Sequence, residues 1–305
     1  MKETNLTKFG DNLLQIINLN VDSTEWIARY QQDFILVKNP SFKFSARYPY
    51  RLGQVVAIIC NEGEAYGAIN LRQFHLTKNS LLIVLSEHIM EAYRVSDDFK
   101  GIYIFMSQKF LSMLNIGDGY KFYETIDENP CFELEDRVMN AIHSYIMMCK
   151  AMINISDINP NTGESLCLLT RLFFLNLGWF MHGNAIGKDT KEHQSDVMDR
   201  FLTLVKNNYK EERTVEFYAD NMNITAKYLT TVIKKVSGKS ALQWIQEYVI
   251  LDAKTQLSNS MNSIKQISYD LNFPTQSFFG RYFKRATGMS PLEYRRSIRI
   301  NTSVR

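Results

Sequence analysis

The sequence holds few of the residues that build metal and catalytic sites. It has 5 histidines and 4 cysteines among 305 residues, and the cysteines show no C-x-x-C or other metal-binding spacing. His75 and His88 do not form an H-x-H motif, and a lone histidine is more often structural. No Ser/His/Asp signature, P-loop or glycine-rich dinucleotide fingerprint occurs. We therefore expect that the chain is not an enzyme and that it has no catalytic residues, no cofactor and no metal.

The sequence also lacks an apolar run long enough to cross a membrane. Its richest apolar stretch, residues 166–180, is shorter than a membrane span and contains Arg171 and Asn176. The apolar run at residues 13–17 is too short and too interrupted for a signal peptide. The cysteines are then expected to be free thiols in a reducing cytoplasm. We expect a cytoplasmic chain with no membrane partner.

Positive charge is concentrated in the C-terminal third. The formal net charge of the whole chain is +3, which alone says little. Residues 195–305 hold 17 Lys+Arg against 10 Asp+Glu, whereas residues 1–194 hold 18 against 22. A local positive excess of this kind is the electrostatic footprint of a nucleic-acid-binding segment.

The same C-terminal segment contains an internal repeat, at residues 225–240 and at residues 275–290. Both copies begin with a threonine, share an apolar-Lys-basic triplet and end near a glycine. Each copy is preceded by a short amphipathic stretch and a turn, at Asn223 or Asn272, and asparagine tolerates the left-handed backbone that a sharp turn requires. The pattern predicts one helix-turn-helix unit built twice.

The second helix of each unit carries signals for both of its ends. Thr225 and Thr275 are expected N-caps, and Gly238 and Gly288 are expected to end the helices in the left-handed conformation. Between these ends, apolar residues recur at helical spacing and are expected to face the core. They are Leu229, Val232, Ile233 and Val236 in the first copy, and Phe279, Tyr282, Phe283 and Ala286 in the second.

Capping boxes that begin at Ser240, Ser263 and Ser290 predict three further helix starts. The helix after Ser240 is expected to extend through Leu257 and to join the two units. Because a helix is stiff, it would hold both units at a fixed separation, suited to major grooves about 34 Å apart on one face of DNA.

A specific signature runs through the second copy, in residues Ile267–Phe273, Phe279, Arg281, Phe283–Lys284 and Gly288–Pro291. With this signature, the chain resembles the AraC/XylS family of transcription regulators over residues 195–297. The usual family pattern has alanine and glycine where this chain has Ser268 and Asn272. The resemblance implies seven helices and a pair of helix-turn-helix units that bind DNA.

By position, the resemblance implies base contacts from both second helices. The candidate base-contacting residues are Lys227, Thr230, Thr231, Gln276, Ser277, Gly280 and Arg281. The candidate residues for contacts to the DNA backbone are Thr225, Lys234, Lys235, Thr275, Lys284 and Arg285. Arginine suits guanine and glutamine suits adenine, although Arg281 could contact phosphate only and Gln276 could be merely solvated. Gly280 indicates either a close approach to DNA or a tolerated glycine, and the basic helix ends also complement helix dipoles.

Residues 30–108 contain short apolar runs separated by turn signals, which predict a β-sandwich or barrel. The expected strands are Phe34–Val37, Val55–Cys60, Ala68–Leu76, Leu81–Leu85, Ile89–Val95 and Ile102–Met106. The segment is similar to the cupin-like barrel of full-length relatives. Two helices are expected next, near Glu133–Ala151 and Glu164–Met181. Helices at this place pair two chains in the family, and the alternative is that they only cover the barrel.

The predicted fold class is α+β with two domains. Residues 1–185 are expected to form a ligand-sensing and dimerising domain, β-rich to about residue 110 and helical over 132–183. A polar linker is expected at 186–194, followed by a DNA-binding domain at 195–300.

The predicted function is sequence-specific regulation of transcription, modulated through the N-terminal domain. The expected partners are double-stranded DNA, a small-molecule effector, RNA polymerase and a second copy of the chain, and the expected place is the cytoplasm, at the nucleoid. No ligand-contacting residue is assigned. Two alternatives stay open: a sequence-neutral architectural DNA binder, and a cupin-type enzyme that its helical domain localises to DNA.

Overall fold

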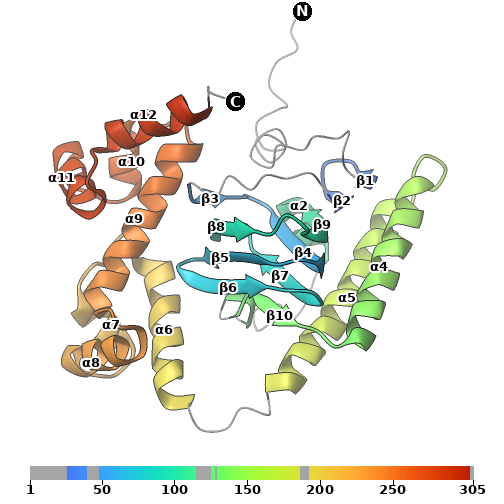
Figure 1. Ribbon diagram of the computed structural model, residues 1–305, viewed down its shortest axis with the longest axis horizontal. Coiled ribbons are helices and arrows are strands. Elements are labelled where there is room, and N and C mark those ends of the chain that lie inside the picture. The colour runs from blue at the N-terminus through green and yellow to red at the C-terminus, as the bar shows by residue number, and fades with distance from the viewer. Residues whose placement is uncertain (1–25, 40–47, 115–124, 128, 186–191, 303–305) are drawn as a thin grey trace, which may run out of the picture. The chain divides into compact units, whose positions relative to one another are not determined.

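The computed structural model describes residues 26–39, 48–114, 125–127, 129–185 and 192–302. The chain divides into two compact units, which adjoin in the sequence at residues 186 and 187. The N-terminal unit combines β-sheets with helices and the C-terminal unit is helical, which confirms the predicted α+β class (Figure 1). In the described part of the chain, no helix is both long and apolar enough to cross a membrane.

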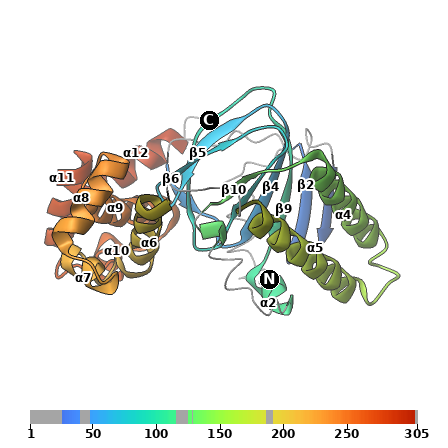
Figure 2. The ribbon, with the colours of Figure 1, turned by 90° about the horizontal axis from the view of Figure 1, so that it is seen from below.

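The strands of the N-terminal unit form two sheets, which Figure 2 shows facing each other. The six-stranded sheet has the order β1 (Trp26–Tyr30), β2 (Phe34–Lys38), β9 (Lys100–Met106), β4 (Val55–Glu62), β7 (Ser80–Val84) and β10 (Cys131–Glu133). The four-stranded sheet has the order β3 (Tyr50–Arg51), β8 (Ile89–Val95), β5 (Ala65–Ile69) and β6 (Arg72–Leu76). Neighbours such as β4 and β7, or β5 and β6, are antiparallel. Short apolar strands joined by tight turns favour this arrangement.

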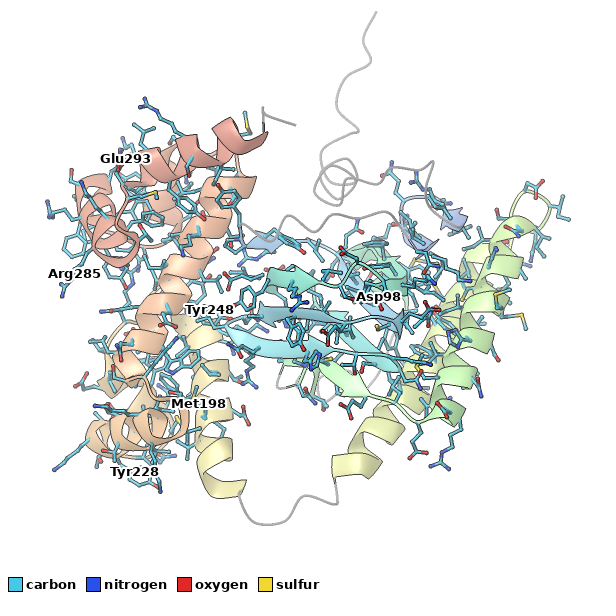
Figure 3. All side chains as sticks on the ribbon, in the orientation of Figure 1. Asp98, Met198, Tyr228, Tyr248, Arg285 and Glu293 are labelled. Atoms are coloured by element: carbon cyan, nitrogen blue, oxygen red, sulfur yellow. The ribbon has the colours of Figure 1, made fainter. Side chains whose placement is uncertain are left out.

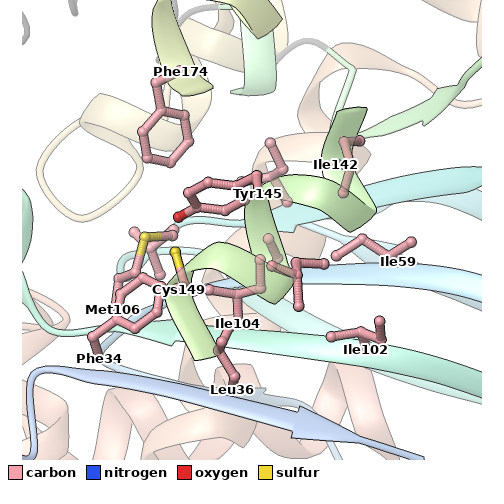
Figure 4. Packing of buried hydrophobic residues seen from close by; sticks show 14 of the residues in the cluster. Phe34, Leu36, Ile59, Ile102, Ile104, Met106, Ile142, Tyr145, Cys149 and Phe174 are labelled. Atoms are coloured by element: carbon pink, nitrogen blue, oxygen red, sulfur yellow. The ribbon is translucent and has the colours of Figure 1, made fainter. Parts of the chain in front are cut away.

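The six-stranded sheet is covered on both faces, which explains why its strands are apolar without interruption. β4 is buried from Val55 to Cys60. Ile58 lines a small apolar cavity between the two sheets together with Phe74. Its neighbour Ile59 points the other way and packs in a cluster with residues of the covering helices (Figure 4).

The covering helices are α4 (Asp136–Asn154) and α5 (Thr162–Ala185), and a short helix, α2 (Gln108–Met113), follows β9. Both longer helices occur where the sequence predicts them. The hydroxyls of Tyr145 and Thr170 share a hydrogen bond of 2.9 Å, and the Tyr145 ring stacks on Phe173 with centroids 4.4 Å apart. These contacts hold α4 and α5 together as a pair.

Several local predictions for this unit are wrong. The run Ala68–Leu76 is two strands rather than one, because Asn70 and Leu71 have positive φ angles of 49° and 69° and reverse the chain. The β-rich part does not end near residue 110, since β10 pairs with β7. β10 has three residues, too few to show an alternating pattern. The strands β1 and β3 and the helix α2 are not predicted either.

Seven helices occupy residues 192–302, the number that the resemblance implies. They are α6 (Glu192–Asn208), α7 (Val215–Asn221), α8 (Ala226–Ser237), α9 (Ala241–Asn259), α10 (Ile264–Asp270), α11 (Gln276–Thr287) and α12 (Pro291–Thr302). The predicted linker 186–194 is wrong in its last three residues, which belong to α6, because no glycine or proline after Gly187 opposes a helix there. Residues 186–191 lie outside the described residues.

Helix α9 is the centre of the C-terminal unit. It contacts α6, α8, α10, α11 and α12, and its buried residues include Ala241, Ile245, Tyr248, Val249 and Ala253. The Tyr209 hydroxyl, just after α6, donates to Oδ2 of the buried Asp252 at 2.6 Å. The predicted joining helix is therefore present and is contacted by helices of both units that it joins.

Gly67 in β5 tests the packing between strands and sheets. A Cβ at this position would meet the carbonyl oxygen of Glu91 and would lie 2.6 Å from the Phe74 ring. Overpacking of this kind costs about 1–3 kcal/mol, so we expect Gly67→Ala to lower the free energy of unfolding of the N-terminal unit by that amount. Urea unfolding followed by circular dichroism measures the change, and an unaltered midpoint would contradict the described spacing of β5 and β8.

Candidate nucleic-acid interface

The two helix-turn-helix units consist of α7 with α8 and of α10 with α11. In each, a threonine caps the second helix: Thr225 Oγ1 accepts from Tyr228 N at 3.2 Å and Thr275 Oγ1 accepts from Phe278 N at 3.1 Å. Gly238 ends α8 with φ 75°, and Gly288 ends α11 with φ 81°. The predicted caps and left-handed ends are therefore confirmed.

The turns are also matched bond for bond. Asn223 has φ 56° and Asn272 has φ 51°, as the sequence predicts. The next residue returns a hydrogen bond to the leading helix in both units, from Ile224 N to the Ala219 carbonyl at 3.0 Å and from Phe273 N to the Ser268 carbonyl at 2.9 Å. The second turn then contains one extra residue, Pro274, before its threonine cap.

One face of each second helix is buried, as predicted, but the buried face is shorter than expected. Leu229, Val232 and Ile233 are buried in α8, and Phe279 and Phe283 are buried in α11. Tyr282 is half-buried. The predictions for Val236 and Ala286 are wrong: Val236 is 44% exposed and Ala286 is exposed too. Both lie at equivalent positions in the last turn of their helices, beyond the buried residues of each helix.

The opposite faces carry the predicted base-contacting residues. Lys227 and Thr231 of α8 are exposed, and so are Gln276, Ser277 and Arg281 of α11. Thr230 and Gly280, which match each other in the repeat, are half-buried. The set thus lies on one polar face of each helix, with its central member closest to the core.

Local contacts limit what two of these side chains can do. The Thr231 hydroxyl donates to the Lys227 carbonyl at 2.8 Å, so its oxygen is left to accept a hydrogen bond from a partner. The Arg281 guanidinium carbon lies 5.8 Å from the centre of the Phe278 ring, within the range of a cation–π contact. Such a contact can orient the Arg281 guanidinium on the exposed face of α11.

The residues predicted to contact the DNA backbone lie at the two ends of α8 and α11, the second helices of the two units, which we call the recognition helices. Thr225 and Thr275 are exposed at the N-termini. Lys234 and Lys235 are in the last turn of α8, and Lys284 and Arg285 are in the last turn of α11. Figure 3 shows Arg285 at the surface of the unit. All four cations are exposed, where they stabilise the negative ends of the helix dipoles and remain accessible to phosphate.

The sequence did not single out two exposed aromatic side chains at the start of the recognition helices. Tyr228 is 45% exposed and its counterpart Phe278 is 47% exposed, and Figure 3 labels Tyr228 at the surface. They flank the buried positions Leu229 and Phe279. The available signal was the repeat itself, which places an aromatic residue at the same position in both units.

His75 and His88 of the N-terminal unit each contact a different carboxylate. His75 Nε2 lies 3.0 Å from Glu64 Oε2 and its ring stacks on Tyr66; the hydrogen bond from His75 holds the pKa of Glu64 below its usual value. His88 is buried, pairs with Asp127 and accepts from Leu85 N at 3.2 Å. Among the described residues, no group of three or more His, Cys, Asp or Glu could hold a metal ion.

A model of a helix-turn-helix domain matches residues 218–297. The raffinose operon transcriptional regulatory protein RafR of Pediococcus pentosaceus is 29% identical over 133 residues, which are 44% of this chain and 47% of that protein. The arabinose operon regulatory protein of Salmonella typhimurium is 31% identical over 77 residues, 25% of this chain and 27% of that protein. The HTH-type transcriptional activator RhaR of Salmonella dublin is 20% identical over 76% of this chain and 81% of its own length.

The match to the raffinose regulator thus spans less than half the length of that relative. Among solved structures, the C-terminal domain of AraT from Geobacillus stearothermophilus is 28% identical, with a TM-score of 0.31 and coverage of 33% of this chain and 84% of that one. ToxT from Vibrio cholerae is 16% identical, with a TM-score of 0.37 and coverage of 90% and 97%.

A substitution at Gly280 distinguishes a glycine that allows close approach to DNA from a glycine that the helix merely tolerates. A Cβ there would meet nothing within 4 Å, and replacing a helical glycine by alanine stabilises a helix by about 1 kcal/mol. We expect Gly280→Ala to raise the free energy of unfolding by about that amount and to weaken binding to specific DNA. Thermal unfolding and a binding titration measure the two effects.

Gly238→Ala is the matched control. A Cβ at Gly238 also meets nothing within 4 Å, but the φ of Gly238 is 75°, a left-handed backbone that alanine disfavours. It is expected to destabilise the unit by about 1 kcal/mol. A stabilised Gly280→Ala variant with unchanged specific DNA binding would show that the glycine is merely tolerated.

Proposed function

We propose that this chain, whose C-terminal unit is a double helix-turn-helix domain of the AraC/XylS type, is a sequence-specific DNA-binding regulator of transcription. One observation carries the proposal: the chain builds the same unit twice, with matched caps and turn bonds, and presents a polar, cationic face on each recognition helix. Two similar but chemically distinct faces suit the reading of a defined sequence. The matched relatives are named as transcription regulators, which favours this function over an enzyme.

In this mechanism α8 and α11 enter adjacent major grooves. The 19 residues of α9 span about 28 Å at 1.5 Å per residue, comparable to the spacing of about 34 Å between successive major grooves. Contacts of the six backbone candidates with phosphate supply affinity for any DNA. Specificity comes from the exposed polar faces.

The base-reading roles differ among the side chains. Arg281 matches guanine and Gln276 matches adenine. Thr231 can only accept from a base because its own proton is donated to Lys227, which favours the amino groups of adenine or cytosine over the acceptor edges of guanine. Lys227 supplies a donor beside it, and Ser277 and Thr230 serve as short contacts.

The N-terminal unit is proposed to dimerise the chain through α5. Leu168, Leu172 and Leu175 are 61%, 57% and 54% exposed and lie at spacings of four and three residues, which puts them on one helix face. An exposed apolar stripe of this kind is typical of a protein contact. The stripe on a second copy would cover it and would bring two DNA-binding units to one operator.

Effector control is assigned to the same unit. The cavity between the sheets has an apolar lining that includes Ile58, Met90 and Tyr103. Its volume of about 10 Å³ is that of a water-sized space, so an apolar effector would enter it only if the two sheets moved apart. Binding there would shift the populations of dimer or domain arrangements. RNA polymerase is the proposed protein partner on DNA, and the cytoplasm, at the nucleoid, is the proposed place of action.

Two alternatives make different predictions. An architectural binder would treat all DNA alike, which the distinct faces of α8 and α11 do not favour. An enzyme localised to DNA would turn over a substrate with its N-terminal unit, where the described residues offer no group of three or more His, Cys, Asp or Glu that could hold a metal ion.

Arg281 and Lys234 separate base reading from phosphate contact. The full chain first selects DNA from a random library, and binding to the selected and scrambled DNA is then titrated at several salt concentrations. Arg281→Ala is expected to cost about 1–3 kcal/mol on selected DNA and to relax one base position. Lys234→Ala is expected to weaken binding to both DNAs equally and to reduce the salt slope by about 1.

Equal losses for Arg281→Ala on selected and scrambled DNA would remove its base-reading role. If the unaltered chain selects no sequence and binds all DNA alike, the architectural function replaces the regulator.

The α5 stripe is tested by Leu172→Glu, with Arg171→Glu as the control at an adjacent exposed position. A buried carboxylate in the interface costs several kcal/mol, so we expect Leu172→Glu to be monomeric at micromolar concentration while the control stays dimeric. Sedimentation velocity measures the mass. A monomeric unaltered chain, or a dimeric Leu172→Glu variant, would contradict dimerisation through this stripe.

A further inference from the structure

The Arg213 side chain connects the two helix-turn-helix units directly. It precedes Thr214, the residue that starts α7. Its guanidinium donates to the carbonyl of Leu271, the residue that ends α10. The guanidinium carbon also lies 4.0 Å from the centre of the Phe273 ring. A residue at the entrance of the first unit therefore contacts both the leading helix and the turn of the second.

Phe273 relays this contact to the second recognition helix. Its ring centre lies 5.2 Å from Phe279 and 5.2 Å from Tyr282, both in α11. Phe273 and Phe279 are buried. Because packed aromatic rings cannot shift independently, the position of the Arg213 guanidinium is coupled to the position of α11.

The backbone that carries Arg213 is held by α6 and by α7 of the first unit. The amide of Glu212 donates to the Asn208 carbonyl at the end of α6 at 2.8 Å, and the Glu212 carbonyl accepts from the Tyr218 hydroxyl of α7 at 2.7 Å. Tyr218 is fully buried. Burial lowers the pKa of the Arg213 guanidinium, so the cation has given up hydration to make its contact.

The repeat shows that this contact is not a general feature of the fold unit. The residue of the second copy that corresponds to Arg213 is Asn262, which precedes the cap Ser263. The Asn262 side chain donates to Asp270 at 3.3 Å, inside its own unit. Only the first copy carries a side chain long enough to reach across, and it is an arginine, whose planar group can bond and stack at the same time.

We propose that Arg213 is a positioning residue that sets the placement of α8 relative to α11 and thereby selects one spacing between the two half-elements of a DNA site. Helix α9 holds the units at a fixed separation along its axis, and the Arg213 contact, between residues 58 apart in the sequence, adds a second tie that opposes rotation about that axis. The placement stands by itself, whereas its consequence for DNA spacing rests on the proposed function.

The placement is tested on the full chain without DNA. Spin labels are attached to cysteines at Glu216 and Lys265, exposed and equivalent positions of α7 and α10, after Cys131→Ser removes the half-exposed native thiol. Pulsed electron–electron double resonance spectroscopy then gives the distribution of distances between the two spin labels. Arg213→Met keeps the apolar stem but removes the hydrogen bond and the stacked cation, and it is expected to broaden the distribution.

Two further variants control the result. Lys210→Met removes one exposed positive charge from the same loop, where the Lys210 Nζ lies over the Tyr209 ring. It keeps the Lys210 carbonyl that accepts from Arg213 at 3.3 Å, and it is expected to leave the distribution unchanged. Arg213→Lys keeps the charge without the planar group and is expected to broaden the distribution less than methionine does. It also serves as the test variant if circular dichroism shows that Arg213→Met is unfolded.

The DNA consequence is measured by selection from a random library with the same full chains. The unaltered chain is expected to enrich two half-elements at one spacing. Arg213→Met is expected to enrich the same half-elements at several spacings and to bind the original site about tenfold more weakly, a loss in the range of a charged hydrogen bond.

The outcomes separate the two proposals. Distance distributions that are the same for the unaltered chain and a folded Arg213 variant would overturn the positioning role, whatever the DNA result. A broadened distribution with an unchanged single spacing would limit Arg213 to a structural role and overturn its selection of spacing. If the unaltered chain selects no sequence while the variants broaden the distance, the positioning role stands and the proposed function fails.

Discussion

The packing of five helices, α6, α8, α10, α11 and α12, against α9 is the constraint on which the C-terminal unit depends. A helix at the surface leaves one face in water, but no residue of α9 from Tyr248 to Leu257 is exposed. Its polar residues must then find partners inside, as Asp252 does with the hydroxyl of Tyr209. The two recognition helices pack against one common helix, so their separation is a property of the core. A chain that joined the same units by a flexible loop would not fix the separation of its recognition helices.

The N-terminal unit depends on a different constraint: its six-stranded sheet buries apolar side chains on both faces. Strand β4 illustrates it, since Ile58 belongs to the space between the sheets and Ile59 to the layer beneath α4 and α5. The unit therefore has two apolar layers within one fold. A molecule entering the inner layer and a second chain contacting the outer helices would both act on the six-stranded sheet, which gives a physical route by which one could influence the other.

Local signals in the sequence predicted the recognition helices well. The caps Thr225 and Thr275, the glycine ends and the asparagine turns each depend on a few neighbouring residues, and the structure has them as expected. The failures concern longer-range effects. Helical spacing puts Val236 on the apolar face of α8 but does not show which part of that face other helices pack against, and β10 exists because β7 is there to pair with it. The Arg213 contact joins two copies of the repeat and leaves no periodic signal. The DNA-contacting roles of the exposed faces stay predictions.

The extra residue in the second turn has a consequence for engineering. Up to Ile224 and Phe273 the two units have equivalent turn bonds, and Pro274 is then added before the cap. Proline restricts the residue before it to extended backbone, and the caps that follow differ in φ, −77° at Thr225 and −148° at Thr275. The two recognition helices are thus not interchangeable modules: a set of side chains transplanted from α8 to α11 would keep its own face but change its setting relative to the leading helix. Redesign of the site must treat the two halves as separate problems.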